Sequence, residues 1–344
     1  MKQIVLPKGL PSPCGKERSE IIELLLSEEY GFLPPTATVK GELISVDERF
    51  CAGKARLEKI KISCNGDFGE FSFPVYFSYP SDKKENPCFV HINFRPDVPD
   101  RYQPTEELID SGYAIISFCY NDVAMDNEDF SDGLAGVIYK DGKKSKKGCG
   151  KIGLWAWAAM RVIDYLQARP EVNYEKISVV GHSRLGKTAL LTGALDDRVY
   201  CAFSNDSGCS GAALSREKQG ETIEKICNQF GYWFCDNYAG YANRESDLPF
   251  DQHWLLAANS HHKVYVASAS EDLWADPDNE YLSCVAASEY FEINGIIGFV
   301  HPDRFPKVGD YFHDGNIGYH LRAGKHYLSR DDWQMFIRFL DKHY

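Results

Sequence analysis

Apolar runs of strand length recur along this chain, and helical patterns separate them. Segments 88–94 (CFVHINF), 113–120 (YAIISFCY) and 176–183 (KISVVGHS) are rich in apolar residues and are bounded by polar loops. Such runs are typical of strands that are buried on both faces of a parallel sheet. Because a long helical pattern at 150–170 lies between them, the chain is predicted to adopt an α/β fold. A mostly parallel central sheet would lie between two layers of helices, as a three-layer sandwich.

Two further strand-like runs extend this predicted sheet. They are 200–206 (YCAFSND) and 263–272 (KVYVASASED), and each of them ends in a carboxylate. The C-terminal segment 329–344 has the pattern of an amphipathic helix. Ser329 would open that helix, because Asp332 follows three residues later, as in a capping box.

The predicted domain organisation is one α/β domain over residues 1–344. Residues 17–35 read as a helix that ends at two prolines, and residues 38–80 alternate as short antiparallel strands do. These segments would form an extension through about residue 85. The aromatic-rich stretch 207–262 is the longest insertion, and we expect it to cover the mouth of the functional site.

Composition limits the partners and the location of the protein. A formal net charge of −12 argues against nucleic acid or an anionic membrane as partner, because both require a basic face. No apolar run approaches the roughly 20 residues that a membrane helix needs. No continuous apolar segment precedes Pro7 and Pro11, so we expect no signal peptide and a cytoplasmic location, unless a leader was removed.

The 11 cysteines are odd in number and include no C-x-x-C pair. This usage favours reduced, buried thiols over a disulfide framework or a structural metal site.

Residues 179–191 (VVGHSRLGKTALL) carry the most informative motif, and it has two interpretations. From Gly181 to Thr188 it matches the phosphate-binding pattern G-x-x-x-x-G-K-T. A phosphate cradle requires small residues so that successive N–H groups can wrap the anion, whereas His-Ser-Arg-Leu stands here. This argues against a phosphate loop, and a P-loop-like nucleotide hydrolase is kept only as the alternative from a different class.

The second interpretation is a nucleophile elbow centred on Ser183. Gly181 lies two residues before the serine, where a sharp strand-to-helix turn leaves no room for a side chain. The usual second glycine would stand at Leu185, but here it stands one residue later, at Gly186. A serine becomes a nucleophile when a neighbouring base takes its proton, so this interpretation predicts a serine hydrolase.

The stretch GHSRLGK resembles the G-x-S-R-x-G-K signature of the glucuronoyl esterases, carbohydrate esterase family 15 of the α/β-hydrolase superfamily. The likeness extends through most of the chain after about residue 85. Besides a Trp-rich helix before the serine, it includes NDSGCSGAA (205–213), LPFDQHWLLA (248–257), EDLWADP (271–277) and GYHLRAGKH (318–326). The chain looks most like the bacterial branch. Fungal members tend to carry a disulfide between the positions that are His182 and Tyr327 here, and the loss of both cysteines agrees with reduced thiols.

The resemblance implies a catalytic triad in the chain order Ser…acid…His. It identifies Ser183 as the nucleophile and His326 as the base, with His320 as a competing histidine. Two residues are candidates for the acid. Asp206 follows the strand after the nucleophile and is favoured, and Asp272 follows the next strand and is the alternative.

The resemblance also implies residues that bind the substrate. Arg184 would stabilise the oxyanion through its backbone N–H and its charge. Lys187 and Glu221 would bind sugar hydroxyls, and Trp274 would pack on the sugar ring.

The expected function is therefore hydrolysis of esters of (4-O-methyl-)glucuronic acid in glucuronoxylan or lignin–carbohydrate fragments, through an acyl-enzyme. No metal or organic cofactor is expected. An acetyl (xylan) esterase of the same fold is the closest alternative, and a binding module without activity is a further one. In the cytoplasm, imported glucuronoylated oligosaccharides would be the substrates.

Overall fold

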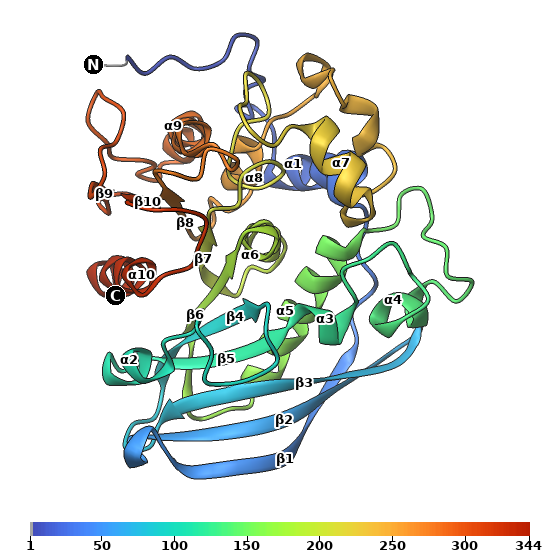
Figure 1. The fold of residues 1–344 in the computed structure, drawn as a ribbon, viewed down its shortest axis with the longest axis vertical. Helices are drawn as coiled ribbons and strands as arrows, with labels where there is room; N and C mark the ends of the chain where they lie inside the picture. The colour runs from blue at the N-terminus through green and yellow to red at the C-terminus, as the bar shows by residue number, and fades with distance from the viewer. Residues whose placement is uncertain (1–2) are drawn as a thin grey trace.

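The computed structural model describes residues 3–344 and confirms the predicted α/β architecture, with a central sheet between helices (Figure 1). These residues form one sheet of ten strands in the order β1-β2-β3-β5-β4-β6-β7-β8-β10-β9. Six strands in the middle of the sheet are parallel to one another. They are β4 (Asn86–Asn93), β5 (Ala114–Cys119), β6 (Val172–His182), β7 (Val199–Asn205), β8 (Lys263–Ala269) and β10 (Ile317–Arg322).

Antiparallel strands complete both ends of the sheet. The predicted N-terminal strands are β1 (Thr38–Phe50), β2 (Ala55–Gly66) and β3 (Gly69–Pro80), and β3 joins them to β5. The two-residue strand β9 (Tyr311–Phe312) pairs with β10 at the opposite end. The predicted N-terminal helix is α1 (Arg18–Leu25), which continues as a π-helical turn, η1 (Leu26–Tyr30).

Helices cover the two faces of the sheet with separate apolar cores. On one face pack α5 (Lys151–Leu166), α6 (Arg184–Leu195) and α9 (Pro277–Ile293), and on the other pack α2 (Thr105–Asp110) and α10 (Arg330–His343) (Figure 1). The long helix α5 is buried almost all round, which explains its lack of a polar face. In α10 the predicted capping box between Ser329 and Asp332 is present.

The remaining short helices lie in the connections between these elements. They are α3 (Tyr120–Val123), α4 (Gly133–Ile138), α7 (Ile223–Phe230), α8 (His253–Ala257), η2 (Cys51–Gly53), η3 (Gly231–Trp233), η4 (Tyr238–Tyr241) and η5 (Glu245–Asp247). Five of them, from α7 to α8, lie in the segment 207–262 between β7 and β8. Within residues 3–344, no helix combines the length and the apolar composition that a membrane crossing requires.

Candidate active site

Ser183 stands on a sharp turn between β6 and α6. Its backbone has φ 58° and ψ −127°, a conformation that L-residues adopt at a cost of roughly 1–3 kcal/mol. Its N–H donates to Asn205 O at 2.8 Å, which holds the turn against the neighbouring strand. A Cβ on Gly181 would lie 2.0 Å from Leu185 O, so only glycine fits there. The turn therefore has the strained geometry that lifts a nucleophilic serine above a sheet.

The displaced second glycine of the motif has a packing reason. Helix α6 passes close to the loop after β7, and a Cβ on Gly186 would lie 3.0 Å from Ser207 Cβ and 3.1 Å from Ser204 Oγ. Leu185, by contrast, points into the apolar core and is fully buried. A side chain at position 186 would crowd Ser204 and Ser207, which favours glycine there, whereas position 185 holds a leucine of the core.

All eight residues that the sequence predicts for the site line one cavity of about 370 Å³. They come from five separate segments, which the carboxyl ends of β6, β7 and β8 bring together with the insertion and the loop after β10. They are Ser183, Arg184, Lys187, Asp206, Glu221, Asp272, Trp274 and His326. Sequence reasoning missed the cavity residues Ser207, Gly208, Gln229, Phe230, Trp233 and Ala275.

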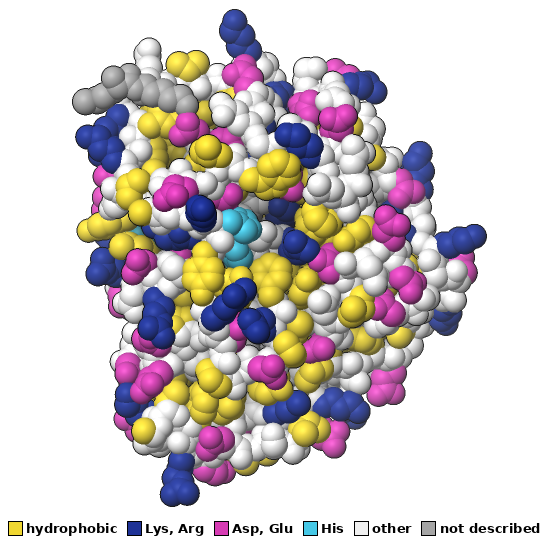
Figure 2. Space-filling view, viewed as in Figure 1, with side chains coloured by type: hydrophobic (Ala, Val, Ile, Leu, Met, Phe, Trp, Pro, Cys, Tyr) yellow, Lys and Arg dark blue, Asp and Glu magenta, His cyan; other side chains and the backbone are white. Residues whose placement is uncertain are grey.

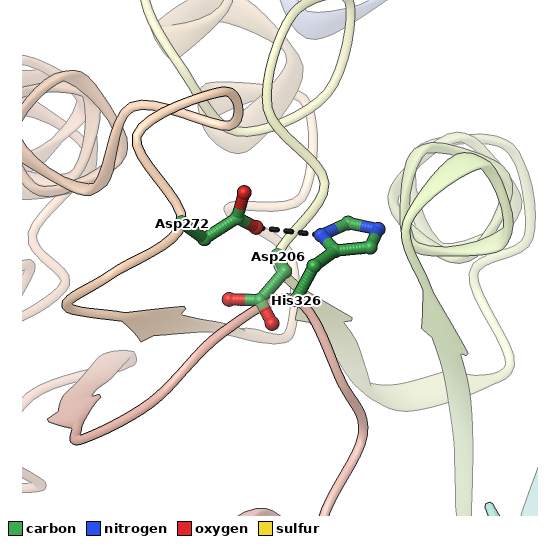
Figure 3. Close-up of side chains that lie close together, drawn as sticks. All are labelled: Asp206, Asp272 and His326. Atoms are coloured by element: carbon green, nitrogen blue, oxygen red, sulfur yellow. Dashed lines mark hydrogen bonds and ion pairs between the residues drawn. The ribbon is translucent and has the colours of Figure 1, made fainter.

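The imidazole of His326 is oriented by Asp272. His326 Nδ1 donates to Asp272 Oδ2 at 2.6 Å, and Nε2 lies on the side of the ring away from Asp272 (Figure 3). The carboxylate of Asp206 turns away from this imidazole (Figure 3). Asp206 Oδ2 instead accepts from Arg322 Nη2 at 3.0 Å and from the N–H of Tyr327 at 3.3 Å. The geometry thus gives the orienting bond to the alternative acid and not to Asp206, which the sequence favoured.

The two carboxyl groups also differ in the direction in which their pKa is shifted. Burial raises the pKa of Asp272, but the hydrogen bond and the positive charge of His326 outweigh it, so the pKa lies below its ordinary value. Burial raises the pKa of Asp206 well above its ordinary value, and the negative charge of Glu280 adds to this rise against the opposing charge of Arg322. Asp272 is therefore the better anion to stabilise an imidazolium.

The competing histidine, His320, is a buried structural residue. Its Nε2 donates to Asp332 Oδ1 at 2.8 Å, and its Nδ1 lies 3.0 Å from the hydroxyl of Tyr265. Both ring nitrogens are satisfied, and the residue does not line the cavity. His326 therefore stays the predicted base.

Arg184 presents a cation to the cavity within an aromatic frame. Its guanidinium carbon lies 4.7 Å from the ring centre of Trp233 and 5.2 Å from that of Phe230. Its Nη1 pairs with Asp126, a carboxylate that also accepts from Trp233 Nε1 at 2.7 Å. Arg184 Nε is buried without a partner among the described residues. Asp126 lies far away in sequence, in a loop that carries no motif, so no local signal points to it.

Lys187 and Glu221 form a buried pair on the wall of the cavity. Their Nζ and Oε2 atoms lie 3.8 Å apart, and Lys187 Nζ also donates to Ser207 O. Lys187 is thus not a solvent-exposed helix cation. Trp274 lies at the rim with 47% of its surface exposed, and Lys225 Nζ lies 5.1 Å from the centre of its ring.

Asp206, Asp272 and His326 are also the one group among residues 3–344 whose ligand atoms lie close enough to hold a metal ion, within 4.8 Å of one another. Two features oppose this use. Arg322 places a positive charge 3.0 Å from Asp206, and the bond between His326 and Asp272 occupies one atom of each. The arrangement suits a triad better than a cation.

Comparison with known proteins agrees with this geometry. A family model described as "Glucuronyl esterase, fungi" matches residues 60–295. The chain belongs to the glucuronoyl esterase family. Membership of an esterase family excludes the phosphate-loop interpretation of residues 181–188 and confirms the resemblance seen in the sequence.

Three similar proteins illustrate the breadth of this glucuronoyl esterase family. The chain is 33% identical to "Carbohydrate esterase MZ0003" from an unknown prokaryotic organism, over 95% of this chain and 84% of that protein. It is 27% identical to "4-O-methyl-glucuronoyl methylesterase 1" of Wolfiporia cocos, over 86% of this chain and 70% of that one. A solved glucuronoyl esterase from Solibacter usitatus is 27% identical, with a TM-score of 0.88 over 100% of this chain and 99% of that chain.

Proposed function

We propose that this chain hydrolyses esters of (4-O-methyl-)glucuronic acid in glucuronoxylan or lignin–carbohydrate fragments, through an acyl-enzyme on Ser183. One observation carries the proposal. A serine on a strained elbow and a histidine bonded to a buried carboxylate line the same cavity as a buried lysine–glutamate pair and an exposed tryptophan. Family relatives that are named glucuronoyl methylesterases support the choice of substrate.

The chemistry follows from these groups. Ser183 Oγ attacks the ester carbonyl carbon while His326 Nε2 takes the hydroxyl proton, and Asp272 stabilises the imidazolium that forms. The backbone N–H and the guanidinium of Arg184 stabilise the negative charge on the carbonyl oxygen. His326 then returns the proton to the departing alcohol oxygen. Water, activated by the same imidazole, attacks the acyl-enzyme and releases the uronic acid.

The sugar is proposed to lie against the part of the cavity wall that Lys187 and Glu221 form. Lys187 would donate to sugar hydroxyls and Glu221 would accept from them, since buried polar groups discriminate strongly for a ligand that satisfies them. Trp274 would cover the apolar face of the ring. This polar wall suits a uronic acid better than the acetyl group of the alternative acetyl esterase, which needs only a small apolar pocket.

The eleven cysteines support a cytoplasmic location, which is a further part of the proposal. All of them are free, and most are buried, as is usual in a reducing environment. A cytoplasmic location would make imported glucuronoylated oligosaccharides the substrates.

Hydrolysis of benzyl glucuronate by the wild type and by Ser183→Ala tests the proposal. We expect turnover by the wild type and its loss in the variant, with release of benzyl alcohol as the readout. If the wild type ignores this ester but cleaves a simple acetate through Ser183, the acetyl esterase alternative replaces the proposed function.

A further inference from the structure

The loop that carries the proposed base lies at the surface of the molecule. It follows β10 and comprises residues 323–327 (AGKHY). Its exposed residues are Ala323, Lys325, His326 and Tyr327. Figure 2 shows histidine at the surface in the middle of the face that it draws. Exposed loops move more than the elements that they connect, whereas a catalytic group must be held to within about 0.5 Å of its productive position. The base therefore needs an anchor in the interior.

One guanidinium, that of Arg322, gathers this loop. Arg322 is the last residue of β10, and 11% of its side chain is exposed. Its Nη1 donates to the carbonyl oxygens of Ala323 at 3.0 Å and of Lys325 at 3.1 Å. Its Nη2 donates to the carbonyl oxygen of Tyr327. These carbonyls lie on both sides of His326 in the chain, so the guanidinium fixes the backbone from which the imidazole projects.

Two buried carboxylates hold the same guanidinium from the interior. Arg322 Nε donates to both carboxylate oxygens of Asp332 at 2.9 Å, and Nη2 also donates to Asp206 Oδ2 at 3.0 Å. Asp332 belongs to the capping box that opens α10, and Asp206 directly follows β7. Hydrogen bonds between charged groups are stronger than neutral ones, and the planar guanidinium fixes their directions. Arg322 thus ties the loop 323–327 to a helix and to a strand of the sheet.

Arg322 acts on the site from outside the cavity. It is not among the described residues that line the cavity, and the wall of Lys187 and Glu221 comes from other segments, α6 and the insertion. We propose that Arg322 is a positioning residue, which sets the place of the His326 imidazole at the ester without contacting the ester or the sugar. This role rests on the proposed function. It also gives Asp206 a task other than that of triad acid, because Asp206 anchors the guanidinium.

The split between kcat and KM tests this role. In Arg322→Ala we expect kcat for benzyl glucuronate to fall about 10-fold to 10²-fold, since a displacement of about 1 Å at a reacting group costs up to about that much. Formation and hydrolysis of the acyl-enzyme both use His326, so both steps slow. KM should stay unchanged, because the wall proposed for the sugar keeps its contacts. Guanidinium ion, added well below the concentration that unfolds the protein, should restore part of kcat because it refills the place of the lost side chain.

Arg198→Ala is the matched control. The guanidinium of Arg198 also bridges two carboxylates, Asp196 Oδ2 and Asp164 Oδ1, both at 2.6 Å, but it lies outside the cavity and far from the loop in sequence. This variant should lose stability and keep kcat. An equal loss of kcat in Arg198→Ala, or a loss in Arg322→Ala that guanidinium ion does not reduce, would assign the effect to general damage and overturn the positioning role.

Arg322→Lys decides the question if Arg322→Ala does not fold. Lysine keeps the charge beside Asp206 and Asp332, but one ammonium lacks the fork that bonds carbonyls on both sides of His326. We expect kcat to fall in this variant as well, with KM unchanged. An unchanged kcat in a folded Arg322 variant would overturn the positioning role while the wild type still turns over benzyl glucuronate. Failure of the wild type on this ester would instead refute the proposed function.

Discussion

Substitution of the two candidate acids, one at a time, separates their roles. Asp272→Asn keeps the size of the side chain and removes the charge that faces His326 Nδ1 at 2.6 Å. Asp206→Asn makes the same change on a carboxylate that bonds Arg322 and the backbone of Tyr327. The two variants make the same chemical change. In Asp272→Asn the imidazole of His326 loses its carboxylate, and in Asp206→Asn the guanidinium of Arg322 does.

The expected magnitude follows from the ion pair that forms during the reaction. When the imidazole takes the serine proton, its charge centre lies about 4 Å from that of Asp272, and such a pair is worth about 4 kcal/mol at an effective dielectric constant of about 20. This corresponds to about 10³-fold in rate. The side chain of His326 is 42% exposed, so solvent screens part of this energy. We expect kcat/KM to fall about 10²-fold to 10³-fold in Asp272→Asn.

Asp206→Asn should stay within about 10-fold of the wild type, which is about 1.4 kcal/mol, because no bond joins Asp206 to the imidazole. The assay is release of benzyl alcohol from benzyl glucuronate, at a temperature where circular dichroism shows both variants folded. A larger loss in Asp206→Asn than in Asp272→Asn would refute the reasoning and return the role of acid to Asp206.

Two further predictions concern stability. Gly181→Ala places a Cβ 2.0 Å from a backbone oxygen and should lower the free energy of unfolding by at least about 2 kcal/mol in urea, whereas Gly231→Ala, with no atom within 4 Å, should change it little. Burial raises the pKa of Glu29 to about 8 from 4.5, so the native state holds a proton that the unfolded chain releases. Stability should therefore decline as pH rises from 4.5 to about 8. Glu29→Gln should flatten this decline, and an equally steep decline in that variant would assign it to other groups.

The sequence alone determined the elements whose signal is local. A strand segment that is buried on both faces is rich in apolar residues, so β5 and the buried parts of β4 and β6 were visible as apolar runs. The elbow was visible as well, because a turn that places a backbone oxygen 2.0 Å from a Cβ at Gly181 admits only glycine. Family likeness then supplied His326 and the residues of the cavity wall.

Tertiary structure decided the questions that depend on competition between distant groups. Asp206 and Asp272 both follow a strand end, and the chain pattern cannot tell which one reaches the imidazole. Arg322, more than a hundred residues away from Asp206 in sequence, binds that carboxylate and leaves His326 to Asp272. A hydrogen bond depends on atomic positions to within a few tenths of an ångström. Those positions are set by the packing of whole strands and loops, which no local pattern encodes.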